Sequence, residues 1–466
     1  MNAALGLESL DYGTRVLRAS AFLGLLALAG AVSVVEPLAG AVVILLTYLL
    51  VRNRGVFRDA LVVLLVGNVT LTYGFANVGL RLGGIPVPLT EILLLPVAAF
   101  ALLRLRSLSG LGPPATLLVG LLTLASVRLV VDVPRWGNLA LRDFTTPLEA
   151  IALVVGFWAV REYGVRWCAR LCLGAALAVL AYGALFPLRD SIATLGPTVG
   201  LQQAVPLLGQ YSGAAPAVAA ALFLFLLRFR APWSPILGAA SLAVIALLQS
   251  RGLYLAIPLA GLSVLLVAGN FGGAFPARLA GSVVLGGFML LLLVPLGPQG
   301  RMGPVSAGFA SSQIVTLLGR DGPGAGSFDH RVHWAQELWS RQNQAVGSVI
   351  WGVGMGPDLA DGAAGGQEFI RKPHNDYLEV FARFGVLGLG LWLGLVGASL
   401  NAVRRGIKAA TDPESKTFLV WILAASLVYL FVAATQPLLA FPYGTMPLFL
   451  MLGMGLALAR GEGTSQ

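Results

Sequence analysis

The chain has 466 residues, of which 57% are apolar and 11% are charged, and its mean hydropathy is +0.83. Soluble domains carry about 25% charged residues, so this composition excludes a soluble globular protein. The formal net charge of +10 suggests nucleic-acid binding, but its distribution along the chain fits the orientation of a membrane protein better.

Apolar runs recur from end to end of the sequence, which predicts an all-α, polytopic helical membrane protein. The runs lack the strict alternation of apolar and polar residues typical of membrane-spanning strands, so a β-barrel is excluded. We expect about 12–14 transmembrane helices, because the first two runs are close enough to form a hairpin. Arg15 and Arg18 precede the first run, which we interpret as an uncleaved span. The runs cover residues 16–35, 37–51, 59–75, 90–104, 114–131, 147–161, 167–186, 213–228, 232–249, 252–268, 278–297, 384–403, 418–434 and 443–459.

The only two cysteines, Cys168 and Cys172, lie four residues apart in one of these runs. Such a pair suits a metal site or a redox pair, but a cysteine in an apolar helix is usually a small buried side chain. We therefore expect these two residues to pack in the core.

Lysine and arginine alternate between successive loops. They cluster after the second, fourth, sixth, eighth and twelfth runs and are sparse after the first, third, fifth, seventh, ninth and thirteenth. Because cytoplasmic loops carry the excess of basic residues, both termini are expected in the cytoplasm. The one long hydrophilic segment, residues 298–373, then lies outside, between the eleventh and twelfth runs. We therefore expect a transmembrane bundle at 1–297, an external segment at 298–383 and C-terminal transmembrane helices at 384–466.

The external segment contains one predicted helix, SFDHRVHWAQELWSRQ, at residues 327–342. Phe328, Val332, Ala335 and Trp339 recur in it at spacings of four, three and four, which indicates an amphipathic helix. We expect this helix to lie on the outer membrane surface or to cap the bundle.

His330, His333 and Glu337 lie on one face of the same predicted helix, at a spacing that can bind zinc. The sequence offers no evident further ligand. We therefore predict no metal site and keep zinc as the alternative.

His374 directly precedes the next predicted helix. The sequence DYLE at 376–379 is typical of a capping box, with Asp376 as the N-cap and Glu379 as its partner. The positive potential of a helix N-terminus favours a neutral imidazole, which a general base requires, and its free N–H groups favour a bound anion such as phosphate. His374 is therefore a candidate catalytic base, and the alternative is an interfacial histidine without a chemical role.

Four short motifs surround this histidine in the sequence. They are Ser250-Arg251-Gly252; Arg331 and Trp334 in the external helix; the turn WGVGMGPD at 351–358; and His374-Asn375 followed after nine residues by Gly385-x-x-Gly388. Together they resemble the signature of the O-antigen ligase superfamily, the bacterial membrane proteins that include O-antigen ligases and surface-polysaccharide polymerases. The resemblance covers roughly residues 245–400, and the N-terminal half is similar only in hydropathy.

The resemblance implies a GT-C type membrane glycosyltransferase that uses no metal or other cofactor and no nucleic-acid partner. Its donor would be a glycan on undecaprenyl pyrophosphate, and its acceptor a lipid A core sugar or another lipid-linked sugar on the periplasmic side of the inner membrane. His374 would take the proton of the acceptor hydroxyl, and the lipid pyrophosphate would leave with inversion. Asn375, Asp376, Gly385 and Gly388 would support this site, as Ser250 and Gly252 would support Arg251.

Without a metal, arginines would neutralise the leaving pyrophosphate. Arg251 is the first candidate, because positive-inside bias should remove an external arginine at a membrane boundary; snorkelling to the headgroups is the alternative. Arg142 and Arg189 are further candidates, but each precedes an aspartate, so a local ion pair is the alternative. Arg331 would serve the phosphate or anchor its helix.

Other residues near the histidine have plainer interpretations. Arg371 and Lys372 are expected to be solvated charges, and Arg383 to pair with Glu379 one helical turn away. The glycines at 385, 388, 390, 394 and 397 are expected to allow close helix packing rather than to line a substrate groove.

Among the functions that these features suit, we favour an O-antigen ligase. A polymerase that joins undecaprenyl-linked repeats is the alternative, since the motifs do not separate the two acceptors. A polysaccharide transporter would also have many spans, but the long external segment and the lack of a detectable repeat between the halves argue against it.

Overall fold

The computed structural model describes residues 54–82, 85–105, 108–201, 204–209, 214–227, 234–248, 326–359 and 372–462, with scattered positions between 256 and 304. This part of the chain is all-α apart from three short hairpins, as the sequence predicts. The predicted runs at 16–35 and 37–51 lie outside the described residues, and those at 252–268 and 278–297 lie largely outside them.

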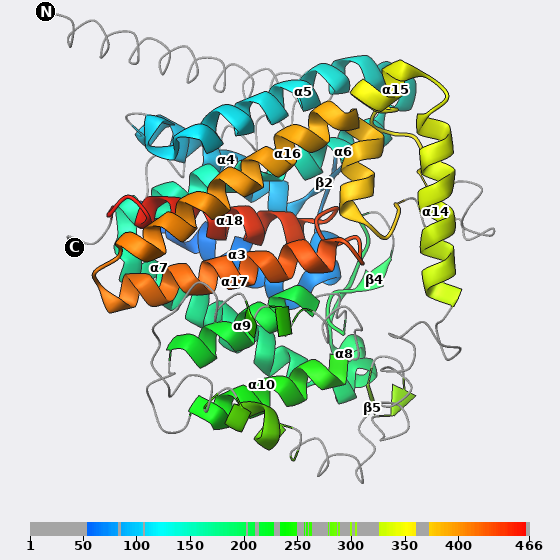
Figure 1. Cartoon of the computed structure of the whole chain (residues 1–466). Helices are drawn as coiled ribbons and strands as arrows, with labels where there is room; N and C mark the ends of the chain where they lie inside the picture. Colours follow the sequence, from blue (N-terminus) through cyan, green and yellow to red (C-terminus); the bar gives the residue numbers. More distant parts are fainter. Residues whose placement is uncertain are drawn as a thin grey trace, which may run out of the picture.

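Long helices lie side by side across the molecule, and shorter elements gather at one end (Figure 1). The helices are α3 Arg54–Ala76, α4 Leu89–Arg104, α5 Pro113–Trp136, α6 Asn138–Glu149, α7 Ala152–Ala184, α8 Arg189–Leu195, α9 Ala214–Leu227, α10 Ser234–Leu248, α14 Gly326–Gln342, α15 Val346–Trp351, α16 Asp376–Ala409, α17 Pro413–Ala433 and α18 Pro442–Leu458, with 3-10 turns at Leu108–Leu111 and Phe186–Leu188. The hairpins pair antiparallel strands: β1 Gly79–Leu82 with β2 Ile85–Pro88, β3 Thr198–Val199 with β4 Val205–Pro206, and β5 Gln299–Gly300 with β6 Gly303–Pro304.

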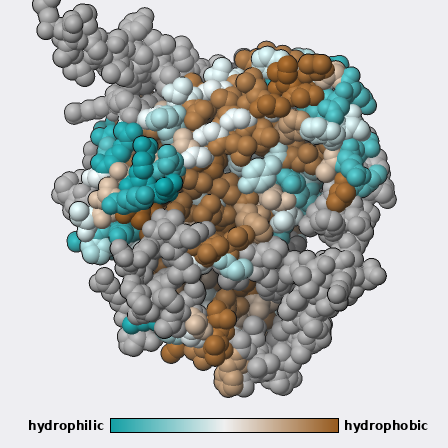
Figure 2. Space-filling model, in the orientation of Figure 1, coloured by the Kyte–Doolittle hydropathy of each residue, from teal (hydrophilic) through white to brown (hydrophobic). Residues whose placement is uncertain are grey.

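Several of these helices have the length and composition of membrane spans. Figure 2 shows hydrophobic surface over the middle of the face in view, with hydrophilic residues gathered towards its two ends, as a bilayer requires. Five described stretches qualify as spans: Gly55–Ala76, Pro113–Trp136, Asn138–Ala184, Asp376–Ala409 and Pro413–Ala433. Shorter apolar helices cover Ala215–Leu226, Gly238–Leu248 and Pro442–Leu458. The chain is therefore a multi-pass membrane protein.

The centre of the bundle is the contact between α7 and α18. Gly156 of α7 faces the carbonyl oxygen of Leu450, and Gly453 of α18 faces that of Leu153, so closely that a Cβ at either glycine would clash. Small residues at such crossings let helix backbones approach. Cys168 and Cys172 of α7 are buried and free in this core, so the expectation that they serve packing is confirmed.

Two long helices are broken by a glycine in the left-handed region of backbone space. Gly164 (φ 77°) kinks α7, and this single residue stands where the sequence predicts a loop between the runs at 147–161 and 167–186. Gly385 (φ 66°) breaks α16 into a short first part, residues 376–384, and a long second part. Figure 1 shows the first part of α16 turned sharply away from the second, towards α14. Positive φ is easily adopted only by glycine, so both breaks are fixed by the sequence.

The two ends of the bundle differ in content (Figure 1). The end that we call the site end carries α14, α15 and the first part of α16. The opposite end carries the C-terminus and the loop between α16 and α17, where Arg161 pairs with Glu462, and Arg166 lies 3.9 Å from Glu414. Asp412 caps α17 there by accepting a hydrogen bond from Ser415 N (2.8 Å), and this bond holds the pKa of the Asp412 carboxyl below its ordinary value.

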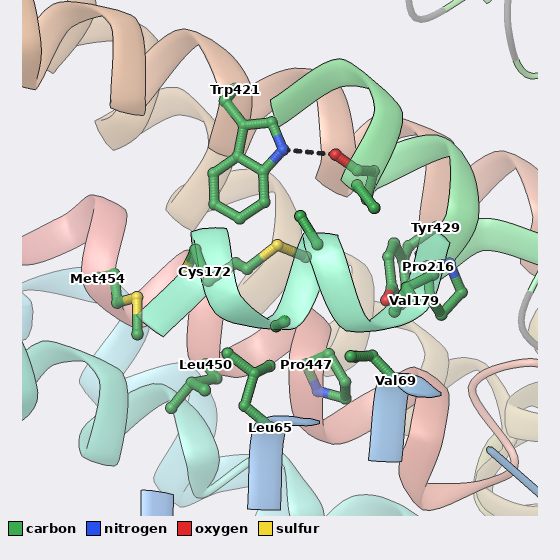
Figure 3. Close-up of a pocket in the computed structure, with 15 residues that line it drawn as sticks. Leu65, Val69, Cys172, Val179, Pro216, Trp421, Tyr429, Pro447, Leu450 and Met454 are labelled. Carbon is green, nitrogen blue, oxygen red and sulfur yellow. Dashed lines mark hydrogen bonds between the residues drawn. The ribbon is translucent and has the colours of Figure 1, made fainter. Parts of the chain in front are cut away.

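A small cavity lies inside the bundle, between α3, α7, α9, α17 and α18 (Figure 3). It has a volume of about 40 Å³ and an almost wholly apolar lining, in which Trp421 Nε1 donates to the carbonyl oxygen of Ala219 (2.8 Å). The lining has no charged side chain that could bind a pyrophosphate, so we do not assign this cavity to the candidate site.

Candidate functional site

His374 lies at the site end, between α14 and the first turn of α16. Its imidazole stacks on the indole of Trp334 from α14, with ring centroids 5.1 Å apart and planes inclined by 19°. Trp334 is 7% exposed, so the indole forms a buried wall against one face of the half-buried histidine. Two segments about forty residues apart in the chain thus meet at the candidate base.

The helix that follows His374 is capped by Asn375, not by Asp376 as the capping-box pattern predicts. Asn375 has extended backbone angles, and its side chain accepts a hydrogen bond from Leu378 N (3.1 Å). Both Asn and Asp are good N-caps. The cap lies one residue earlier than predicted because the Asp376 carboxylate is bonded elsewhere. Next to the base there is therefore a helix N-terminus whose first turn is partly satisfied by a neutral side chain.

Asp376 reaches across to the loop that joins α17 to α18. Its buried carboxylate accepts hydrogen bonds from Leu439 N (2.6 Å) and Ala440 N (3.1 Å). Tyr377 adds a second link, because its hydroxyl donates to the carbonyl oxygen of Leu430 at the end of α17 (2.8 Å). The start of α16 is thereby tied to the last two helices of the chain.

A chain of buried charges crosses the first part of α16. Arg383 donates from Nε to Glu379 (3.0 Å), as predicted, and also lies 2.7 Å from Asp143 of α6 through Nη1. The Arg383 and Asp143 side chains are 2% and 0% exposed. Buried charges must be paired to persist, so this network fixes how α6 and α16 meet.

Lys372 belongs to the same network, and the prediction that it is a solvated charge is wrong. Its side chain is 14% exposed, donates to the carbonyl oxygen of Ala440 (2.9 Å), lies 3.5 Å from Glu379 and covers the ring of Phe441 at 5.2 Å. The sequence pattern suggested solvation because a lysine beside an arginine is usually exposed. Arg371 lies outside the described residues.

The glycine turn at 352–356 docks the segment between α15 and α16 onto the bundle. Gly352, Gly354 and Gly356 all have φ between 78° and 106°, which winds successive N–H groups towards acceptors. Val353 N and Gly354 N donate to the carbonyl oxygens of Ala382 and Arg383 (2.7 and 3.1 Å), at the end of the first part of α16.

The next two amides of this turn bind carboxylates of the N-terminal half. Met355 N donates to Asp132 of α5 (2.8 Å), and Gly356 N donates to Asp143 of α6 (2.9 Å). The turn therefore joins three helices, and each of its glycines has a structural reason.

The amphipathic helix α14 is present as predicted, but its buried face differs from the predicted one. Trp334, Leu338 and Gln342, at i, i+4 and i+8, point inward, and the Gln342 amide reaches the carbonyl oxygens of Phe381 and Ala382 (both 3.4 Å). Of the face predicted from apolar spacing, Val332 and Trp339 are exposed, at 38% and 56%, and the Phe328 side chain lies outside the described residues. The pattern misled because it contains two apolar stripes and the inner one includes a glutamine.

With this geometry in view, the comparison with known families decides the assignment. Residues 236–393 match the family model described as O-antigen ligase. The chain carries a domain of the O-antigen ligase superfamily. The resemblance expected from the motifs is thus confirmed, and the matched segment contains α14, the glycine turn, His374 and the break at Gly385. A search of curated proteins finds no match.

Of the four arginines expected to bind the donor pyrophosphate, the structure describes the side chains of two. Arg251 lies outside the described residues together with Ser250 and Gly252, and so does the Arg331 side chain, although its backbone belongs to α14. Arg142 and Arg189 lie beside their neighbouring aspartates, with Nε 3.7 Å from Asp143 and 3.3 Å from Asp190.

Arg142 lies next to the charge network, whereas Arg189 makes a local pair. Asp190 is 89% exposed, so the Arg189 pair is a surface contact. Asp143 is already bonded to Arg383 and Gly356, and Arg142 Nε forms no hydrogen bond to the part of the chain that the structure describes. Arg142 thus differs from Arg189 in lying beside buried charges of the site end, and it stays a candidate for the expected phosphate site.

Three of the five glycines that follow the histidine have close neighbours. A Cβ at Gly385 would clash with the backbone of Ile350, and one at Gly388 with Phe384. Gly394 faces Leu117 of α5, while Gly390 and Gly397 are exposed with no neighbour near a Cβ. Close packing explains three of the five, and the other two do not line a groove among the described residues.

No group of three or more metal-ligating side chains converges in the described ranges. The carboxylate of Glu337 in α14 instead pairs with Arg341 (3.1 Å). The His330 side chain lies outside the described residues, and His333 is exposed.

Several residues of the site were missed from the sequence. Asp132, Asp143 and Gln342 lie on helices whose patterns show nothing unusual, and Glu91 of α4 and Glu149 of α6 form a further buried acidic contact behind the network. Each is a polar residue within an apolar or amphipathic stretch. A signal of that kind marks functional positions in membrane helices, and it would have found Glu91 and Glu149, which lie within the predicted spans 90–104 and 147–161.

Proposed function

We propose that this chain is a glycosyltransferase that moves a glycan from undecaprenyl pyrophosphate to a lipid A core sugar on the periplasmic side of the inner membrane. The observation that carries the proposal is the position of His374. It lies in an O-antigen ligase domain, at a helix N-terminus, against a buried tryptophan and two residues from Lys372 of the charge network. A base needs this kind of fixed and accessible position.

The chemistry follows from that position. His374 accepts the proton of the acceptor hydroxyl, and the hydroxyl oxygen attacks the anomeric carbon of the donor sugar. The bond from that carbon to the pyrophosphate oxygen breaks with inversion, and undecaprenyl pyrophosphate leaves. Arg251, Arg142, Arg189 and Arg331 are the proposed partners of the leaving charge, since guanidinium groups bind phosphate oxygens bidentately.

The proposed orientation puts the site end in the periplasm and both termini in the cytoplasm, with the periplasmic segment at 298–383 between the bundle and the last helices. Exposed basic residues gather at the opposite end, which favours this orientation. In a cysteine-free background, Gln344→Cys should react with a membrane-impermeant maleimide in whole spheroplasts, and Lys408→Cys only after lysis. The reverse pattern would invert the topology.

Two assays separate the candidate functions. Purified protein in proteoliposomes is given the lipid-linked glycan with or without lipid A core. A ligase makes a core-linked glycan only when the core is present, whereas a polymerase, the second candidate, lengthens the lipid-linked glycan without it. A transporter releases no undecaprenyl pyrophosphate in either case.

The reaction is proposed to need no metal, because the sequence has no Asp-x-Asp pair in an external loop and offers external arginines instead. Enzyme treated with EDTA should form product at an unchanged rate, and added Mg²⁺, Mn²⁺ or Zn²⁺ should not raise it. Activity that is lost with EDTA and restored by one ion would make His330 and His333 the first ligands to test.

A further inference from the structure

Two residues flank His374 at equal distance and hold the same partner. Lys372, two residues before it, donates to the carbonyl oxygen of Ala440 (2.9 Å). Asp376, two residues after it, accepts from Ala440 N (3.1 Å). Residues 372–376 therefore form an arch whose two feet rest on one residue of the loop between α17 and α18, with His374 at the middle of the arch.

The arch has little internal freedom. Pro373 has a fixed φ and confines Lys372 to extended backbone, so the link from the first foot to the histidine is stiff. On the other side, the Asn375 side chain is fixed by its cap bond to Leu378 N. A displacement of either foot is thus transmitted to the imidazole.

The first foot of the arch is the ammonium group of Lys372, and burying a cation costs desolvation free energy. Lys372 is 14% exposed and is surrounded by Glu379, the Ala440 carbonyl and the Phe441 ring. Desolvation of such a charge commonly cancels the gain from its partners, so a buried pair adds little net stability but fixes geometry. Lys372 is also the first described residue after 359, so the arch stands at the start of the described stretch 372–462.

We propose that Lys372 is a positioning residue for the transfer reaction: together with Asp376 it clamps His374 over Ala440 and sets the direction of the imidazole. This inference rests on the proposed function, in which His374 is the base. Lys372 acts through the arch and does not touch the substrate.

A positioning role predicts a specific kinetic pattern. Misplacing a catalytic group by about 1 Å costs roughly 100-fold in rate. Lys372→Met, which keeps the length of the side chain and removes its charge, should lower kcat about 10- to 100-fold while KM for the lipid-linked donor changes less than about threefold. Lys372→Arg should recover part of kcat. Lys408→Met, at an exposed lysine of the opposite end, is the matched control and should leave both constants unchanged.

The clamp also predicts coupling between its two feet. Lys372→Met and Asp376→Asn act on the same peptide of Ala440, so their effects on kcat should be less than additive. Unchanged kcat in folded Lys372→Met, a raised KM with unchanged kcat, or fully additive effects would each overturn the proposal.

A second measurement does not depend on what the protein transfers. In a background with His330 and His333 replaced by Asn, His374 is the only histidine, and its carbethoxylation by diethyl pyrocarbonate reports how firmly it is held. The rate should rise severalfold in Lys372→Met and stay unchanged in Lys408→Met. Equal carbethoxylation rates with and without Lys372→Met would overturn the clamp. If these rates differ but the wild-type protein transfers no glycan, only the proposed function is overturned.

Discussion

The two ends of the bundle use charge in opposite ways. At the opposite end the Arg161–Glu462 pair is partly exposed, and the Arg166 and Glu414 side chains, 3.9 Å apart, are 77% and 47% exposed. At the site end the Arg383 and Asp143 side chains, 2.7 Å apart, are almost fully buried. In the proposed orientation, basic residues at the opposite end need only be present in excess, without fixed partners.

The charges of the site end need defined partners, because each was removed from water. Surface pairs contribute about 0–1 kcal/mol, whereas removal of one member of a buried pair costs about 3–5 kcal/mol. A protein retains such pairs where geometry matters more than stability. The contrast therefore locates the candidate site independently of the histidine.

The helix caps repeat the contrast. Asn375 and Asp412 use the same bond, from a side-chain oxygen to the N–H three residues on, to start α16 and α17. Only the cap at the site end is surrounded by further bonds, through Asp376 and Tyr377. The following changes test whether the two ends differ in this way.

The largest expected effect comes from Arg383→Met. It leaves Asp143 and Glu379 buried without their shared cation, so the free energy of unfolding should fall by about 3–5 kcal/mol. Thermal unfolding in detergent measures the loss. Arg404→Met, exposed on the same helix, should change it by no more than about 0.5 kcal/mol. Equal effects of the two changes would remove the distinction between the ends.

Gly385→Ala should come next. Its φ of 66° and the nearby Ile350 carbonyl leave no room for a Cβ, so we expect a loss of about 1–3 kcal/mol and of transfer activity. Gly390→Ala is the matched control on the same helix, in open space, and should be neutral or stabilise by about 0.5–1 kcal/mol. A stable, active Gly385→Ala protein would mean that the break in α16 is not required.

Trp334→Leu should reduce kcat about tenfold, because an aromatic stack contributes about 0.5–1.5 kcal/mol and here it supports the base. Trp334→Phe keeps a ring and should recover most of the rate. Val332→Ala, on the exposed face of the same helix, should leave kcat unchanged. Steady-state transfer rates decide, and a larger loss for Val332→Ala than for Trp334→Leu would reverse the orientation of α14.

The smallest expected effect is that of Asp412→Ala at the opposite end. Loss of an N-cap costs about 1 kcal/mol at most sites, and activity should not change. Since the pKa of Asp412 is lowered in the folded protein, its contribution is present above its unfolded pKa of about 3.9 and is lost as pH falls through the folded value. The difference in unfolding temperature between wild type and Asp412→Ala should therefore be larger at pH 7 than below the unfolded pKa of about 3.9, and should shrink further as pH falls.

The sequence predicted what depends on local pattern. Apolar runs located α3, α5, α9, α10, α17 and α18 to within a few residues or about one turn, and the spacing of Glu379 and Arg383 predicted their pair. The helix α14 was predicted in place but with the wrong inner face, because Gln342 is buried through hydrogen bonds that hydropathy does not register.

Long-range polar contacts were beyond the sequence. The sequence around Asp143 does not show that it meets Arg383, and the sequence around Lys372 does not show that it meets Ala440. Each partner lies far along the chain. The cap moved from Asp376 to Asn375 for the same reason. Family motifs pointed to His374 and the glycine turn, and the residues that hold them came only from the three-dimensional arrangement.

The release of undecaprenyl pyrophosphate tests the central claim most directly. Purified wild-type protein and His374→Ala are incubated with the lipid-linked glycan and lipid A core, and the released lipid pyrophosphate is measured. A general base contributes about 10²- to 10⁴-fold, so we predict one lipid released per glycan transferred by wild type and a loss of that size in a His374→Ala protein that unfolds at the wild-type temperature. Release by His374→Ala at the wild-type rate would contradict the assignment of the base and, with it, the proposed site.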